Sequence, residues 1–94
     1  MTPEFTVTDN PDAARYEIAA DGEWAGFVTY RLSPGVIAFL HAEVDPVRER
    51  QGIASRLVSQ ALDDARARGL AVRPVCPFVA AYIERNPRYA DLVA

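Results

Sequence analysis

The hydrophobic pattern of the chain changes its period near Gly52, and this change limits the folds that the chain can adopt. Before it, apolar residues alternate with polar ones, as at Tyr16, Ile18 and Ala20, which is the period of a half-buried strand. After it, apolar residues recur at spacings of three and four, which is the period of a helix with one buried face. The pattern predicts strands first and then a long helix.

Turn-forming residues divide the first half into four predicted strands. Asp21-Gly22 and Ser33-Pro34-Gly35 separate apolar runs, and glycine accepts the positive φ of tight turns. The fourth strand begins with apolar residues at both parities, which predicts a central strand covered on both faces. The strands are expected at residues 5–8, 15–20, 24–32 and 36–44.

The second half predicts a helix, a strand and a short helix. Gly69 is expected to follow the end of the long helix, and Asp63 and Asp64 fall outside its apolar stripe and are expected to face solvent. A strand at residues 70–76 and a helix at 78–85 come next, and Tyr89 and Leu92 are expected to pack back onto the core. The stripe itself consists of Ala54, Leu57, Val58, Ala61, Leu62 and Ala65.

The connections predict the sheet. Short turns make the first four strands an antiparallel meander, and a strand–helix–strand connection is a right-handed parallel crossover. The fold class is therefore α/β (α+β): a mostly antiparallel mixed sheet of about five strands, with one long crossover helix and a short C-terminal helix. Ninety-four residues predict a single domain over residues 1–94.

Composition excludes several function classes. The net charge of −3 argues against general nucleic-acid binding, because phosphate backbones need a basic surface. One cysteine and one histidine leave no zinc site of the usual type, so no metal is expected. No apolar run is long enough for a membrane span, and the N-terminus has no leader pattern, so a cytoplasmic protein is expected. The oligomeric state is left open.

The loop at residues 45–54 is a candidate anion site. A helix N-terminus offers unpaired N–H groups and positive dipole charge, Gly52 lets a ligand approach the backbone, and arginines flank the turn. These features suit a pyrophosphate. The alternative is an ordinary strand–helix turn in which the glycine only relieves backbone strain.

Four segments together resemble a known family. They are Phe39-Leu40-His41-Ala42-Glu43-Val44-Asp45-Pro46, residues 50–58 with Gln51-Gly52-Ile53-Ala54, residues 72–83 with Pro74-Val75-Cys76-Pro77-Phe78, and Asn86-Pro87. The set is similar to a small stand-alone branch of the GCN5-related N-acetyltransferase superfamily, over roughly residues 15–93. The resemblance implies the minimal form of that fold, acetyl-CoA as cofactor, and an amine acceptor on a protein or a small molecule.

The resemblance also implies where the cofactor binds. The pantetheine arm would pair with the fourth strand near Val44, and Tyr82 and Asn86 would contact the cofactor from the short helix. Glu49 stands where the family's loop has Gln or Arg, so Arg48 or Arg50 is expected to supply the missing cation. The pyrophosphate would lie on the N–H groups of Gln51, Gly52, Ile53 and Ala54.

Three residues are candidates for the chemistry. His41 is a candidate base, because histidine is the side chain that most often serves as a base near neutrality. Glu43 shares its face at period two, so Glu43 would orient or replace His41. Cys76 either shapes the acetyl pocket, with direct attack by the amine, or is acetylated first; direct transfer is favoured. His41 follows Val36 by five residues, which predicts opposite faces of the strand.

The predicted function is therefore an acetyl-CoA-dependent N-acetyltransferase. Two alternatives remain open. One is a non-catalytic acyl-CoA-binding or sensing module, because Glu49 departs from the family's loop. The other is a protein-interaction domain that keeps only the fold.

Overall fold

The computed structural model describes residues 3–94, apart from the side chains of residues 49–51. Its strands are β1 (Phe5–Asn10), β2 (Arg15–Ala20), β3 (Glu23–Ser33), β4 (Val36–Val44) and β5 (Ala71–Pro74), and its helices are α1 (Ile53–Ala67) and α2 (Pro77–Arg85). Three 3₁₀ segments, η1, η2 and η3, lie at Pro11–Ala13, Pro46–Gln51 and Pro87–Leu92.

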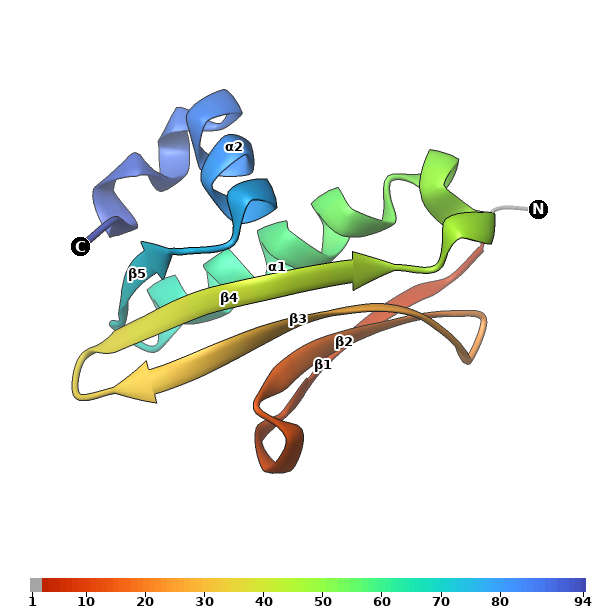
Figure 1. The fold of residues 1–94 in the computed structure, drawn as a ribbon, viewed down its shortest axis with the longest axis horizontal. Helices are drawn as coiled ribbons and strands as arrows, with labels where there is room; N and C mark the ends of the chain where they lie inside the picture. Colours follow the sequence, from red (N-terminus) through yellow and green to blue (C-terminus); the bar gives the residue numbers. More distant parts are fainter. Residues whose placement is uncertain (1–2) are drawn as a thin grey trace.

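The strands form one sheet in the order β1-β2-β3-β4-β5. The first three pairings are antiparallel and β4 pairs with β5 in parallel, which confirms the predicted fold class (Figure 1). The fifth strand is shorter than predicted, because Val75 donates its N–H to the carbonyl of Arg73 at 3.0 Å and turns away from the ladder.

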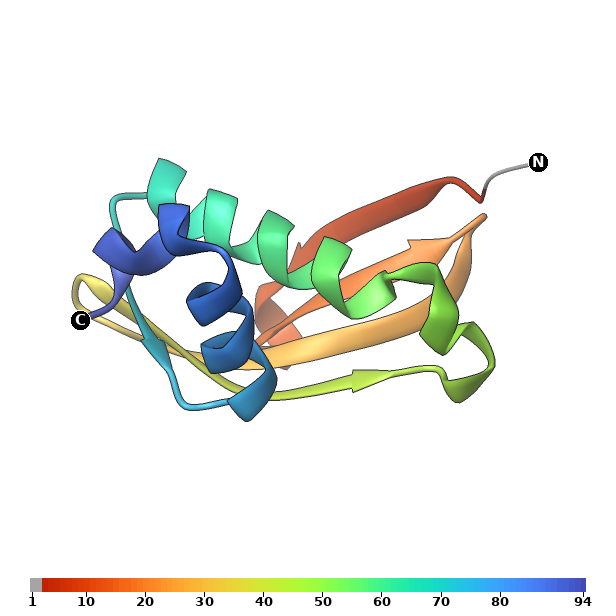
Figure 2. The same cartoon turned by 90° about the horizontal axis from the view of Figure 1, so that it is seen from above.

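All the helices lie on one face of the sheet (Figure 2). The buried stripe of α1 packs on this face against sheet residues such as Ile18, Val28 and Phe39. Tyr89 and Leu92 are buried beside it, as predicted. The expectation that β4 is covered on both faces is wrong: Val36 and Ala38 point to the open face and are only half-buried. No helix in the described part is long and apolar enough to cross a membrane.

A β-bulge in β4 changes which residues face the helices. Thr29 pairs with His41 and Tyr30 with Phe39, so Leu40 is an extra residue. Val36 and His41 consequently both pair with residues on the open face of β3, and the predicted opposite faces are wrong. The period-two rule fails here because a bulge inserts one residue into the alternation.

Tyrosine hydroxyls join the helices to each other and to the sheet. Tyr16 on β2 donates to Asp64 on α1, and Tyr89 on η3 donates to Asp63 at 2.7 Å. Both aspartates accept a hydrogen bond, and Asp63 is exposed as predicted, whereas Asp64 is half-buried. Burial, together with the hydrogen bond to Asp63, raises the pKa of Tyr89 to about 12.

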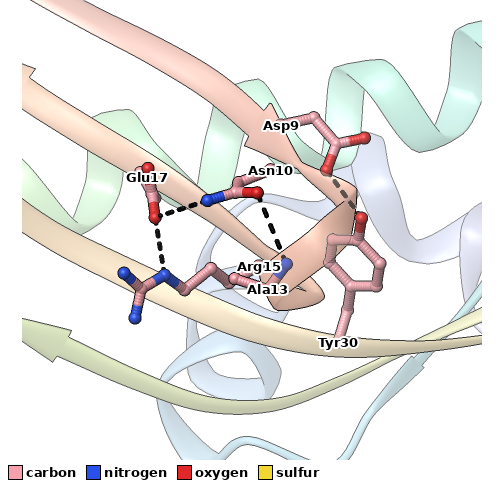
Figure 3. A network of polar contacts seen from close by, with 6 residues as sticks. All are labelled: Asp9, Asn10, Ala13, Arg15, Glu17 and Tyr30. Carbon is pink, nitrogen blue, oxygen red and sulfur yellow. Dashed lines mark hydrogen bonds and ion pairs between the residues drawn. The ribbon is translucent and has the colours of Figure 1, made fainter.

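The turn between β1 and β2 is held by polar contacts (Figure 3). Asn10 donates to Glu17 at 3.2 Å and accepts from the N–H of Ala13 at 3.4 Å. Tyr30 on β3 donates to Asp9 at 2.6 Å, and burial with this bond raises the pKa of Tyr30 to about 12. The end of β1 is thereby tied to the middle of the sheet.

Candidate functional site

Strands β4 and β5 part in the middle of β4. Their pairing runs from Val36 with Ala71 to Phe39 with Pro74. The N–H of Cys76 makes the last bond, to the carbonyl of Phe39 at 2.8 Å. From there α2 leads the chain away while β4 continues to Val44 (Figure 1). Among the described residues, no strand pairs with the second half of β4 on this side.

The second half of β4 directs backbone groups into this parting. The N–H of Asp45 donates to the carbonyl of Ala25 on β3 at 2.8 Å. Peptide groups alternate in direction along a strand, so those of Ala42 and Val44 point away from β3, toward the side that β5 has left. An extended ligand with amide groups can pair with them as a further strand would. The predicted contact near Val44 stays a prediction, with a suitable backbone edge present.

The N-terminus of α1 follows after η2. Gly52 has a left-handed conformation, with φ 68° and ψ 28°, and its carbonyl accepts the N–H of Arg56 at 3.1 Å. None of the described side chains caps the helix, and the N–H groups of its first turn, at Ile53 and Ala54, lack partners within the helix. A Cβ added at Gly52 would meet nothing described within 4 Å. The positive φ explains the glycine, and the open space permits a ligand.

The structure describes the side chain of only one of the two predicted loop cations, Arg48. Arg48 lies 3.2 Å from Glu23 and 4.0 Å from Asp45, measured between nitrogen and carboxylate oxygen. Its charge is therefore already compensated by two acids. The predicted side-chain roles of Arg50, Gln51 and Glu49 fall outside the described residues.

A further arginine near the loop faces β1, at the other edge of the sheet from the parting. Arg56 lies in the first turn of α1, with its guanidinium carbon 4.4 Å from the centre of the Phe5 ring. It borders a surface hollow of about 250 Å³ with Val7 and Ser59.

His41 and Glu43 lie together on the open face of the sheet, with the imidazole Nε2 3.8 Å from a carboxylate oxygen. Their side chains are 63% and 59% exposed, respectively. The His41 ring also lies 6.3 Å from that of Phe27, centre to centre. The pair is thus open to solvent, and the two residues share one face as predicted.

Cys76 lies in a different environment from His41. It is 3% exposed and belongs to the buried hydrophobic core, immediately before α2. Its backbone N–H donates to the carbonyl of Phe39 on β4. The structure therefore brings His41 to Glu43 and does not bring it to Cys76.

The two predicted contacts from α2 are occupied within the fold. Tyr82 is 8% exposed and its ring lies 6.1 Å from that of Tyr89. Asn86 donates its side-chain amide to the carbonyl of Tyr82 at 2.8 Å, at the C-terminal end of α2. Both residues have a structural role here, and their contact with a cofactor remains a prediction.

Gly26 supports the site from β3, and sequence reasoning did not select it. It pairs with Val44, and an added Cβ would lie 2.7 Å from the carbonyl oxygen of Glu43. A glycine inside a strand pattern was the available signal, since it often marks a close backbone approach.

Comparison with known proteins agrees with this geometry. A family model described as GCN5-related N-acetyl-transferase matches residues 15–92, which include the parting of β4 and β5, the start of α1 and all of α2. No curated protein matches the chain. The match spans most of the sequence, and the chain belongs to the GCN5-related N-acetyltransferase family.

Proposed function

We propose that the protein binds acetyl-CoA and transfers its acetyl group to an amine. The observation that supports this most is the sequence of features along one stretch of chain. Unpaired peptide groups at Ala42 and Val44 are followed, after one short 3₁₀ segment, by the uncapped N-terminus of α1. An extended arm of amides and an anionic pyrophosphate suit these two features in this order.

The chain's own residues then have distinct tasks. The N–H groups of Gln51, Gly52, Ile53 and Ala54 hold the pyrophosphate, and the edge of β4 near Val44 aligns the pantetheine arm. Acetyl-CoA, when bound, would supply an acetyl thioester, whose carbon–sulfur bond would be replaced by a carbon–nitrogen bond to the amine, with CoA leaving as a thiolate that takes up a proton. Cys76 forms part of the wall of the acetyl pocket.

His41 accepts the proton that the amine loses, directly or through water, and Glu43 orients the imidazole. Direct transfer is favoured over an acetylated cysteine for a physical reason. The reactive form of cysteine is the thiolate, and the apolar core around Cys76 offers no charged partner among the described residues. His41 cannot be that charged partner, because it lies with Glu43 on the exposed face of the sheet.

Substitutions at Gly52 test the cofactor site. Gly52→Val should abolish CoA binding, measured by isothermal titration calorimetry, because a side chain there blocks the approach to the backbone. Valine is also strained at φ 68°, so Gly52→Asn is the sharper variant, since asparagine accepts this conformation. Gly69→Asn is the matched control, because Gly69 ends α1 at φ 69° with nothing within 4 Å.

We expect Gly52→Asn and Gly69→Asn to lose similar stability, while only Gly52→Asn loses CoA affinity. If Gly52→Val binds CoA with the same affinity as wild type, the cofactor binds elsewhere on the protein. Release of free thiol from acetyl-CoA with a panel of amines then separates an enzyme from a binding module. CoA binding without acceptor-dependent thiol release would leave only the binding module.

A further inference from the structure

The open face of the sheet carries a groove beside the proposed transfer site. It has a volume of about 290 Å³ and lies over the ends of β3, β4 and β5 that pair fully. Its floor is apolar and two arginines stand at its sides. The floor consists of Val36, Ala38, Leu40 and Val75, and the two arginines are Arg31 and Arg73.

The two arginines are placed by the strand register. Arg31 on β3 pairs with Ala38 on β4, and Ala38 pairs with Arg73 on β5. The three side chains therefore form one row across the sheet, on one face, with the arginine Cα atoms about 10 Å apart. The small methyl of Ala38 leaves the space between the guanidinium groups open. Two flexible arginines at this separation can both donate to one carboxylate between them.

The charge of this row is not compensated. Among the residues that the structure describes, no acid lines the groove, and neither Arg31 nor Arg73 forms an ion pair. Several other arginines do pair with an acid, namely Arg15, Arg48, Arg66 and Arg68. In a protein of net charge −3, two unpaired arginines over an apolar floor fit an anion with an apolar body.

The groove reaches the place where β4 and β5 part. Leu40 is the bulge residue that follows the last paired position, and Val75 precedes Cys76, whose N–H closes the ladder. Ala38 and Leu40 are two residues apart, which is about 7 Å along a strand. A ligand held by the arginines can therefore place an atom about 7 Å away at the parting.

We propose that this groove binds the amine acceptor by its carboxylate, so that the acceptor is an amino acid derivative or short peptide end with a carboxylate about 7 Å from the reacting nitrogen. An extended dipeptide with free ends has this spacing. Its apolar side chains lie on Val36, Leu40 and Val75, and its carboxylate lies between Arg31 and Arg73. Polyamines are poor acceptors under this arrangement, because a second cation meets two arginines. The inference rests on the proposed transferase function.

The kinetic test compares alanyl-alanine with alanyl-alanine amide as acceptors for acetyl-CoA. Both are assayed at pH 9, where their amino groups are mostly neutral. We expect the carboxylate form to have a KM at least tenfold lower, since a charged hydrogen bond contributes about 1.5–3 kcal/mol, which corresponds to about 10-fold or more. Arg31→Gln and Arg73→Gln should each raise the KM for the dipeptide and leave that for the amide unchanged.

Arg88→Gln is the matched control, because it removes the same charge from η3 in the helical layer, and it should change neither KM. Equal KM values for the two acceptors, or loss of the difference in Arg88→Gln as well, would overturn the inference.

A binding measurement separates this inference from the proposed function. N-acetyl-alanyl-alanine and its amide are titrated into the protein, and backbone amide shifts of Arg31, Ala38 and Arg73 are followed by NMR. We expect saturable shifts for the carboxylate only. Shifts without any acetyl transfer would retain the carboxylate site and refute the transferase. Acetyl transfer without carboxylate-dependent shifts would refute the site and retain the transferase.

Discussion

Gly26 should control the edge of β4 without touching any ligand. An added Cβ would lie 2.7 Å from the carbonyl oxygen of Glu43, 3.3 Å from Cα of Val44 and 3.4 Å from its Cγ2. Ordinary contacts begin near 3.4 Å, so Gly26→Ala requires a displacement of about 0.7 Å. The obstacle is backbone in the ladder between β3 and β4, which cannot rotate aside as a side chain would.

Two effects follow from this displacement. Overpacking of this kind costs about 1–3 kcal/mol of unfolding free energy. Val44 moves with its strand, so its peptide groups no longer align with the pantetheine arm. Loss of about one hydrogen bond, about 1.4 kcal/mol, raises the Kd for CoA about tenfold.

Urea unfolding measures the first effect and calorimetry with CoA measures the second. Gly69→Ala is the control, because it places alanine at a positive φ with no neighbour within 4 Å. It should lower stability by about 1 kcal/mol and leave CoA affinity unchanged. If Gly26→Ala unfolds at the same urea concentration as wild type and binds CoA with the same affinity, the added methyl does not displace β4 and the explanation of Gly26 is wrong. Equal loss of affinity in both variants would show that stability, rather than strand position, sets binding.

Two further predictions concern pH and catalysis. Burial raises the pKa of Tyr30 and of Tyr89 to about 12, above the value of about 10 in an unfolded chain. The stability that these neutral phenols contribute is complete below pH 10 and falls as the pH rises toward 12. The urea concentration at the unfolding midpoint should therefore fall between pH 10 and pH 12, and it should fall less steeply in Tyr30→Phe. A midpoint that stays constant over this range would contradict the prediction. His41→Ala should lose about 10²–10⁴-fold in turnover, whereas Cys76→Ala retains substantial activity. An acetyl-Cys76 adduct that forms and decays at the turnover rate, seen by mass spectrometry, would instead establish the covalent route.

The elements of the fold could be predicted because their signals are local. Alternation marked β2 and the three- and four-residue spacing marked α1, while the length of the connection between β4 and β5 implied a parallel pair. The bulge at Leu40 could not be predicted, since one additional apolar residue leaves the local composition unchanged.

Long-range polar contacts were equally hidden. Tyr16 and Asp64 are 48 residues apart, and Tyr89 and Asp63 are 26 apart. The row from Arg31 to Arg73 likewise exists only once the register of three strands is fixed. The order of the candidate backbone groups along the chain could be inferred from sequence. The faces of Val36 and His41 relative to each other could not, because the bulge lies between them.

The bulge also limits how β4 can change during evolution. A strand that lost Leu40 would restore simple alternation, and every residue from His41 to Val44 would exchange faces. The imidazole and the carboxylate would then point under α1, and Ala42 and Val44 would point to solvent. Substitutions along β4 can be accepted one at a time, whereas a single-residue deletion alters the core and the candidate site in one event. We therefore expect the length between Phe39 and Gly52 to vary in η2, where the chain does not alternate, before it varies in the strand.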